Sequence, residues 1–272
     1  MVQELGGFIA NQTEYYASKN AGVKNIFIEP SMFLGRILFS ESPYAKIKND
    51  QSYDEKVKMY SKIEWDKYIE TSPVNIPVKD RHNFEDMGIS KLLATDNWIK
   101  FKRKIYHKYI TKEREEYDSV GFTVAENIKK YIRRRILSKT YEQPLSGEKY
   151  IYYPLHVPHN FQLYVRSPEF INQEALIEYL GRCLPYGYKL YVKEHSAAIG
   201  AHALWPTRYY LKSHNTKLIH PRVNSFDLIK NADCVVTINS KVGVEALMQL
   251  KPVIVLGKAF YRGHGITHDV KN

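Results

Sequence analysis

From about Glu148 to the end of the chain, short apolar runs alternate with amphipathic segments. The apolar runs KYIYYPLHV, YKLYVKEH, KLIHP, CVVTINS and PVIVLG have the length of strands, and INQEALIEYLGRCLP, RYYLKSH, SFDLIKNA and KVGVEALMQL between them have helical periodicity. The strands are apolar throughout, which is typical of a parallel sheet covered on both faces. Residues 148–272 are therefore predicted to form a doubly wound α/β domain.

Two further stretches precede this domain. In residues 1–50, GGFIANQTEYYASKNAG predicts a helix that ends at Gly22, and NIFIEP predicts a short buried strand. Such a helix lacks the preceding strand beside which it should pack, so we expect a partial α/β domain, the end of a larger one. Residues 51–147 are polar, basic and mainly helical in pattern, with helices expected in YDEKVKMYSKIEWDKYIE, NWIKFKRKIYHKYITKEREEYD and VAENIKKYIRRRILSKT.

The composition narrows the class of protein. Of the 272 residues, 44% are hydrophobic and 25% charged, which excludes a mainly disordered chain, a collagen-like chain and a disulfide scaffold. The cysteines, Cys183 and Cys234, lie in segments that are predicted to be buried, so we expect free thiols in a reducing compartment. No apolar run approaches the roughly 18 residues of a membrane span, and MVQELGG has no apolar signal core. We expect a cytoplasmic protein.

The net charge of +11 favours polyanions, anionic lipid surfaces or phosphorylated small molecules as partners. Arg133, Arg134 and Arg135 stand among apolar neighbours, a pattern compatible with a nucleic-acid or membrane-surface face. The alternative is a solvated helix face near an anionic substrate cleft. Zinc-ligand spacing, an RNA-binding aromatic motif and a helix-turn-helix signature are all missing from the sequence, so nucleic acid is not an expected partner.

The candidate binding residues follow from the sheet. Ligands of doubly wound sheets bind beyond the carboxyl ends of the strands. The polar and small residues that come directly after the predicted strands are His156, Lys193, Glu194, His195, His220, Asn239, Ser240 and Gly257. A purely structural domain would not need so many titratable groups there, so we expect a ligand site at this edge.

The segment TINSKVGVEAL contains the sharpest local signal. Ser240 stands where a helix N-cap is expected, and Gly243 leaves space beside the helix start, a combination that favours anion binding. Glu245 lies one turn further, where a carboxylate can accept hydrogen bonds from ribose hydroxyls. The alternative is that Ser240 only caps the helix and Glu245 only favours its positive end. The motifs GxGxxG and GxxxxGK[ST] do not occur, so neither the usual dinucleotide fold nor a phosphate-loop NTPase is indicated.

The segment KEHS ends another predicted strand. Alternation along the strand sends the side chains of Lys193 and His195 to one side and that of Glu194 to the other. A histidine can donate a proton or a hydrogen bond to a leaving phosphate, and a lysine can neutralise that phosphate. A structural role for the histidine is the alternative.

These segments carry a family resemblance. The runs YYPLHVP, LPYGYKLYVKEHS and LIHPRVNSFDLIKNADCVVTINSKVGVEALMQLKPVIVLGKAFYRGHGIT resemble the bacterial capsule polysaccharide biosynthesis family, which includes β-Kdo transferases and related surface-carbohydrate glycosyltransferases of the GT-B fold. The resemblance covers roughly Tyr150 to Thr267 and is weaker in GGFIANQ and NIFIEPSMFLGR. It implies a metal-independent glycosyltransferase without cofactors. Its Rossmann-like C-terminal domain would hold a CMP- or UDP-linked sugar, such as CMP-Kdo, and its N-terminal domain a glycan or glycolipid acceptor.

The resemblance also assigns roles to the donor-side residues. His195 matches the histidine of the family's His-Pro element, which contacts the nucleotide phosphate, although Ser196 stands where proline is usual. Ser240 and Gly243 match the phosphate-binding helix start, and Glu245 matches the acid expected near the ribose. His156, Lys193 and Glu194 complete the expected donor site.

The catalytic carboxylate has no direct match. In relatives the PLHVP segment precedes an acid and a glutamine; Gln173 is near the place of the glutamine, but no acid corresponds. Because acceptor-side acids of GT-B enzymes come from the N-terminal domain, Glu4 is the candidate, beside His195, for a catalytic role.

Two other functions stay open. One is a UDP-sugar epimerase of the same architecture, for which no pair of acids is evident. The other is a truncated, non-catalytic module that binds nucleotide sugars, since the chain is short for two complete GT-B domains. For the location we expect the cytoplasm, with peripheral association at the inner face of the cell membrane as an open alternative.

Overall fold

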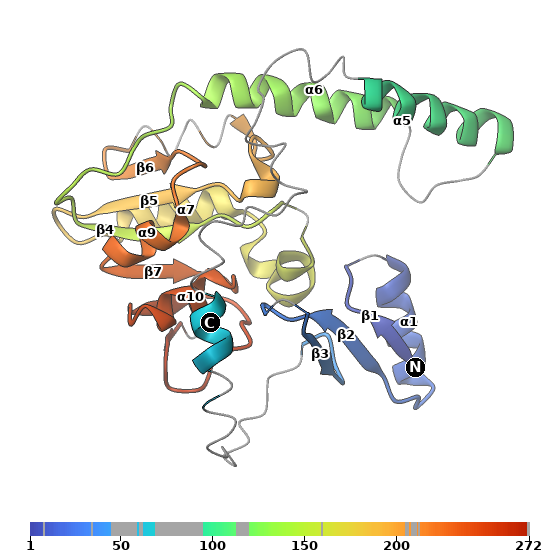
Figure 1. Cartoon of the computed structure of the whole chain (residues 1–272), viewed down its shortest axis with the longest axis horizontal. Helices are drawn as coiled ribbons and strands as arrows, with labels where there is room; N and C mark the ends of the chain where they lie inside the picture. The colour runs from blue at the N-terminus through green and yellow to red at the C-terminus, as the bar shows by residue number, and fades with distance from the viewer. Residues whose placement is uncertain are drawn as a thin grey trace.

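The computed structural model describes residues 1–44 except Phe8 and Leu34, residues 59, 62–68, 95–112, and 120–270 except His159 and positions 205, 206, 208–210 and 212. Figure 1 shows a small N-terminal sheet, an arm of two helices and a larger C-terminal sheet.

The C-terminal sheet is parallel throughout. Its strands are β4 (Tyr150–Pro154), β5 (Lys189–Lys193), β6 (Thr216–Ile219), β7 (Cys234–Thr237), β8 (Val253–Val255) and β9 (His268–Asp269). They lie in the order β6-β5-β4-β7-β8-β9, and every neighbouring pair is parallel. This confirms the predicted doubly wound sheet, while the two-residue edge strand β9 was not predicted.

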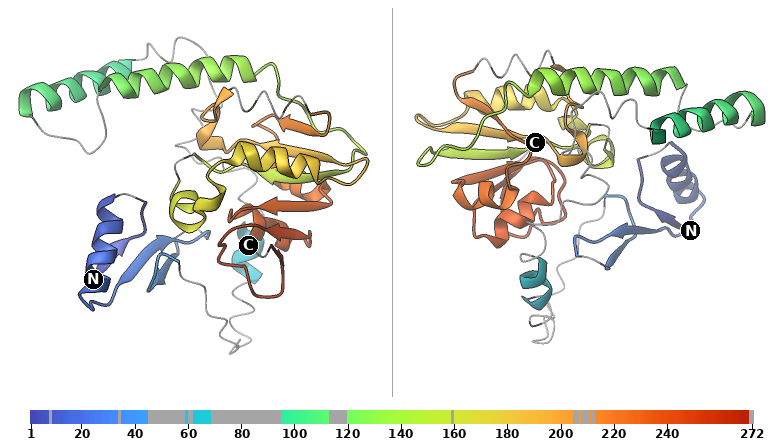
Figure 2. Two further views of the ribbon diagram at one scale, coloured as in Figure 1. Left: turned by 180° about the vertical axis from the view of Figure 1, so that it is seen from behind. Right: turned by 45° about the horizontal axis from the view of Figure 1, so that its top comes forward.

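Helices cover both faces of this sheet. The helices α9 (Ser225–Asn231) and α10 (Val242–Met248) lie on one face, and α7 (Gln173–Arg182) lies on the other (Figures 1 and 2). Side chains alternate along the strands, so Tyr152 packs into the core beneath α9 and α10, whereas Tyr153 packs into the second core with Ile177 of α7. Both faces are thus buried, which explains why the strands are apolar without alternation.

The strand order reverses in the middle of the sheet. From β4 the chain proceeds to β5 and β6 in one direction, and it then returns to place β7 on the opposite side of β4. The carboxyl ends of β4 and β7 therefore flank the topological switch point, the usual position of a ligand in this type of sheet.

The N-terminal sheet contains β1 (Val2–Glu4), β2 (Ile26–Pro30) and β3 (Ile37–Ser40), with α1 (Ile9–Asn20) between the first two. The predicted helix and strand are confirmed. The expectation that the helix lacks a preceding strand is wrong, because β1 pairs in parallel with β2. The strand β3, which pairs antiparallel to β2, was also not predicted.

The basic middle stretch contributes an arm. The helix α5 (Thr95–Tyr106) continues into a π-helical turn, η1 (His107–Thr111), and α6 (Val120–Leu137) follows. Figure 1 shows α6 beside the C-terminal sheet and α5 extending beyond it. Of the helix predicted around residues 53–70, residues 59 and 62–68 are described and are helical, whereas most of RYYLKSH lies outside the described residues. None of the helices in the described part of the chain combines the length and the apolar character of a membrane span.

The two cysteines are free thiols, as expected, but they are less buried than predicted. Both are free, but Cys183 at the C-cap of α7 is exposed, so its predicted burial is wrong. Cys234 is half-buried, and burial raises the pKa of its thiol to about 11.

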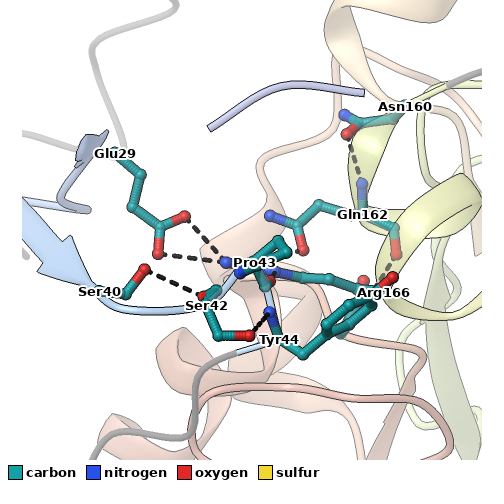
Figure 3. Close-up of polar contacts among 9 residues, drawn as sticks. Glu29, Ser40, Ser42, Pro43, Tyr44, Asn160, Gln162 and Arg166 are labelled. Carbon is teal, nitrogen blue, oxygen red and sulfur yellow. Dashed lines mark hydrogen bonds and ion pairs between the residues drawn. The ribbon is translucent and has the colours of Figure 1, made fainter. Parts of the chain in front are cut away.

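Arg166 joins the two sheets. It belongs to a π-helical turn, η2 (Gln162–Arg166), that follows β4. Its guanidinium donates to both carboxylate oxygens of Glu29 on β2, at 3.2 Å each, and to the carbonyl of Pro43 at 2.9 Å (Figure 3). It also lies 5.1 Å from the ring centroid of Phe161. The N-terminal sheet is thereby fixed beside the segment that follows the central strand.

Candidate functional site

The predicted donor-side residues follow strands that end at one edge of the C-terminal sheet, whereas Glu4 belongs to the N-terminal sheet. The strands β5, β4 and β7 are neighbours and parallel, so the residues that follow them gather at the same end. His156 follows β4, Lys193 and His195 end or follow β5, and Ser240 follows β7.

The backbone of His156 is hydrogen-bonded to Gln173, and these bonds do not involve the imidazole ring. Its amide donates to Oε1 of Gln173 at 2.8 Å, and its carbonyl accepts from Nε2 of Gln173 at 3.2 Å. The residue is 6% exposed, and its Nε2 has no hydrogen-bond partner among the described residues. Burial lowers the pKa of His156 to about 4, and the charges of His195 and His202 lower it further. The ring is therefore neutral at pH 7, and its buried nitrogen lacks the partner that such atoms normally have.

His202 is a buried member of the site that the sequence did not suggest. Its Nε2 lies 3.2 Å from the carbonyl oxygen of His156, and its Nδ1 lies 3.3 Å from Oε1 of Glu174. Both neighbours are acceptors, so both ring nitrogens must donate for the two bonds to form together. Burial raises the pKa of Glu174, but the hydrogen bond and charge of His202, together with backbone hydrogen bonds, outweigh burial, so this pKa lies below its ordinary value.

Lys193 points from the end of β5 toward α9. Its ammonium donates to Oγ of Ser225, the first residue of α9, at 2.7 Å. Burial lowers the pKa of Lys193 to about 8, against the opposing effect of the Glu245 charge. Lys193 therefore places a cation at this edge of the sheet, and this cation loses its charge near pH 8.

Glu194 points to the opposite side, as alternation predicts. Its Oε2 accepts a hydrogen bond from the phenol of Tyr141, and its Oε1 accepts from the amide of Gly200 at 2.9 Å. Burial raises the pKa of this carboxyl. Both oxygens are thus engaged by the protein, and they fix the loop that follows β5.

Arg133 and Arg134 of α6 donate hydrogen bonds to the loop that follows β5. Nε of Arg134 donates to the carbonyl of Ile199 at 2.7 Å, and Nη1 of Arg133 donates to that of Ala201 at 3.2 Å. Gly200 between them has φ +71°, and a Cβ there would lie 2.6 Å from Cγ of Arg134. The interpretation of the three arginines as one solvated helix face is therefore wrong for Arg133 and Arg134, while Arg135 is exposed.

His195 is the N-cap residue of the short 3-10 helix η4 (Ser196–Ala198). Its Nδ1 accepts from the amide of Ala197 at 3.1 Å, so the neutral ring carries its proton on Nε2. The side chain is exposed, and the serine in place of the usual proline is the first residue of this helix.

The start of α10 differs slightly from the prediction. The helix begins at Val242 with Lys241 at the N-cap, one residue later than expected. Ser240 still forms a capping bond, because its Oγ accepts from the amide of Val242 at 3.2 Å. A Cβ on Gly243 would lie 2.2 Å from the phenol oxygen of Tyr261, which donates to the carbonyl of Ser240 at 2.6 Å. Gly243 is required here by the tyrosine, a reason that the local sequence did not reveal.

Glu245 is covered by a residue from the middle stretch. The carboxylate accepts a hydrogen bond of 2.5 Å from the phenol of Tyr68, and the ammonium of Lys241 lies 3.9 Å away. Glu245 is 4% exposed and Tyr68 is 8% exposed. The sequence predicted the position of the acid but not its partner.

Glu4 lies in the N-terminal sheet, at the end of β1, with an exposed side chain. The loop that follows it packs on the start of η2, since a Cβ on Gly7 would lie 3.4 Å from Cα of Phe161. A catalytic role for Glu4 stays a prediction.

Comparison with known proteins identifies the family. Residues 88–272, more than half of the chain, match the family model described as capsule polysaccharide biosynthesis protein. The chain belongs to this family. No curated protein matches it. Within this capsule polysaccharide biosynthesis chain, the donor-side residues from His156 to Glu245 lie inside the matched region, whereas Glu4 and Tyr68 lie outside it.

Solved structures show distant similarity. The β-Kdo 2,7 transferase of Thermosulfurimonas dismutans KpsC is 26% identical, with 57% of this chain and 48% of that chain covered and a TM-score of 0.39. The β-Kdo 2,4 transferase of the same KpsC is 14% identical, with 100% and 73% covered and a TM-score of 0.49. WaaG, a glycosyltransferase involved in lipopolysaccharide biosynthesis, is 11% identical, with 99% and 86% covered and a TM-score of 0.31. The match to the 2,7 transferase spans about half the length of that structure.

Proposed function

We propose that this chain is a metal-independent glycosyltransferase of the GT-B kind that transfers a sugar from a nucleotide donor to a capsule or surface glycan or glycolipid. The observation that carries the proposal is the group of His156, Lys193 and His195 beyond the strands that flank the switch point of the sheet, inside the region that matches the capsule polysaccharide biosynthesis family. Kdo from CMP-Kdo is the donor that the sequence resemblance favours.

The donor-side residues offer suitable groups for a nucleotide sugar. The ammonium of Lys193 is suited to neutralising phosphate charge, and the Nε2–H of His195 is suited to donating to the phosphate oxygens as the nucleotide leaves. The neutral ring of His156 is suited to a sugar hydroxyl, which can donate and accept. Glu245 on α10 is suited to the ribose diol.

Transfer requires one proton acceptor on the acceptor side. The acceptor hydroxyl attacks the anomeric carbon, the bond from that carbon to the phosphate oxygen breaks, and its electron pair stays on the phosphate. The hydroxyl proton passes to a carboxylate, for which Glu4 in the N-terminal sheet is the proposed base. The link between Arg166 and Glu29 keeps this sheet beside the donor domain.

We also propose that the arm contacts an anionic membrane surface or a lipid-linked acceptor. A groove of about 510 Å³ between α5 and α6 is lined by apolar side chains that include Phe101, Ile105 and Ile128. The exposed Lys102 and Arg103 lie on α5 beside it. Vesicles with and without anionic lipid, sedimented with the protein, test this part: binding that requires the anionic lipid is the expected result.

Donor consumption tests the main proposal. Nucleotide release from CMP-, UDP-, GDP- and dTDP-sugars is measured with and without a capsule-type glycan acceptor, after a ligand-protection screen selects the donor. A transferase releases nucleotide faster when the acceptor is present. An epimerase converts the sugar without releasing nucleotide, and a binding module is protected by the donor without turning it over.

A further inference from the structure

Tyr68 is hydrogen-bonded to Glu245, the acid of the proposed ribose site. Its phenol donates a 2.5 Å hydrogen bond to Oε1 of Glu245, although the two residues are 177 positions apart. Glu245 is 4% exposed and is therefore closed to any ligand while this contact persists. The phenol O–H makes the same kind of bond to the carboxylate that a ribose hydroxyl would make.

An aromatic cluster holds Tyr68 in this place. Its ring stacks on Trp65, with centroids 5.4 Å apart and planes at 24°. Phe33, from the N-terminal part, contacts the ring edge-on at 5.9 Å, and Phe226 of α9 lies at 6.4 Å. The helical stretch 62–68 thus contacts the N-terminal part through Phe33 and the C-terminal domain through Phe226 and Glu245.

An ion pair described for this stretch attaches it to the N-terminal part. This pair, between Glu64 and Arg36 at 3.3 Å, joins side chains that are 31% and 63% exposed, and such exposed pairs contribute little to stability. The hydrogen bond to Glu245 is charge-assisted and is the strongest single polar contact described for Tyr68. A ligand that supplies its own hydroxyl to Glu245 can therefore replace it.

We propose that Tyr68 is an internal competitor for the nucleotide, a cap whose phenol takes the position of a ribose hydroxyl on Glu245 and leaves when a nucleoside phosphate binds. The inference rests on the proposed function, because it needs a nucleotide site at α10. It predicts that the unliganded protein is mostly capped and that its apparent affinity is reduced by the fraction of uncapped molecules.

Calorimetry with CMP and with UDP tests the competition. Tyr68→Phe keeps the ring in its aromatic cluster but loses the bond to Glu245, so we expect it to bind the preferred nucleotide about tenfold more tightly than the wild type. The matched control is Tyr150→Phe, which removes a buried phenol bond of 2.8 Å to the carbonyl of Leu228 and not a bond to Glu245. This control should leave the affinity unchanged.

Trp65 supplies an independent signal. Because its indole stacks on Tyr68, saturating nucleotide should shift its fluorescence in the wild type, and Trp65→Phe should abolish that shift. Equal affinity of wild type and Tyr68→Phe, or weaker binding by the variant, would overturn the cap while leaving the nucleotide site in place. If neither protein binds either nucleotide, the proposed function fails, and the cap fails with it.

Discussion

Arg166 binds both carboxylate oxygens of Glu29, each at 3.2 Å, and this pair connects the N-terminal sheet to the segment after β4. The side chains are 12% and 22% exposed, so the pair is shielded from most solvent. Arg166→Met removes the bonds to Glu29 and Pro43 and leaves a carboxylate without its partner. We expect a loss of about 2–3 kcal/mol in the free energy of unfolding, measured by urea titration.

The pair between Lys24 and Glu41 is a matched control. Its nitrogen-to-oxygen distance is also 3.2 Å, but the two side chains are 78% and 73% exposed. Glu41→Gln should therefore change the free energy of unfolding by less than about 0.5 kcal/mol. Equal effects of the two substitutions would show that Arg166 does not hold the sheets together.

The arm fixes the loop that contains His195. Arg134→Met removes the 2.7 Å bond from Nε to the carbonyl of Ile199, so we expect faster hydrogen exchange at the amides of residues 197–201 and a loss of about 1–2 kcal/mol in stability. Arg135→Met is the control, since this neighbouring side chain is exposed. Unchanged exchange in the Arg134 variant would contradict the clamp.

Gly243 makes room for the phenol of Tyr261. In Gly243→Ala the new Cβ would lie 2.2 Å from the phenol oxygen, so something must move, and we expect a loss of about 1–3 kcal/mol in thermal or urea unfolding. Gly121 is likewise the second residue of a helix, α6, but has nothing within 4 Å of an added Cβ. Gly121→Ala should be neutral or stabilising, because alanine favours helix. Similar effects at both glycines would mean that Tyr261 adapts freely.

The sequence predicted the sheet because each apolar run is a buried strand, and it predicted the positions of His156, Lys193 and Ser240 because parallel strands end at the same edge. It missed β1, which has three residues and no apolar run of its own. It also missed two hydrogen bonds at the site. Tyr68 and Glu245 are 177 positions apart in the sequence, and Arg134 and Ile199 are 65 positions apart. Such contacts depend on how the segments pack, and no local pattern encodes them.

The charge of Lys193 gives the proposed donor site a pH dependence. Burial lowers the pKa of Lys193 to about 8. The side chain therefore carries a positive charge below this pH and loses the charge as the pH rises through it. We expect the affinity for UDP or CMP, measured by calorimetry, to fall by up to about tenfold between pH 7 and pH 9. Lys193→Met should bind weakly and almost equally at both values. A steep fall in the variant as well would place the titrating group elsewhere.

His156 makes the protein sensitive to acid. Burial lowers its pKa from 6.5 to about 4 in the folded protein. Between these two values the unfolded chain binds a proton that the folded protein does not, so stability falls as the pH decreases from about 6.5 to about 4. The gap between the two pKa values corresponds to a loss of about 3 kcal/mol at most. His156→Gln cannot take up this proton, so its free energy of unfolding, from urea titrations at pH 7.5 and 4.5, should fall by about 2 kcal/mol less than that of the wild type. An equal fall in the free energy of unfolding of the two proteins would show that water reaches the ring of His156 and that the ring is protonated in the folded state at pH 4.5.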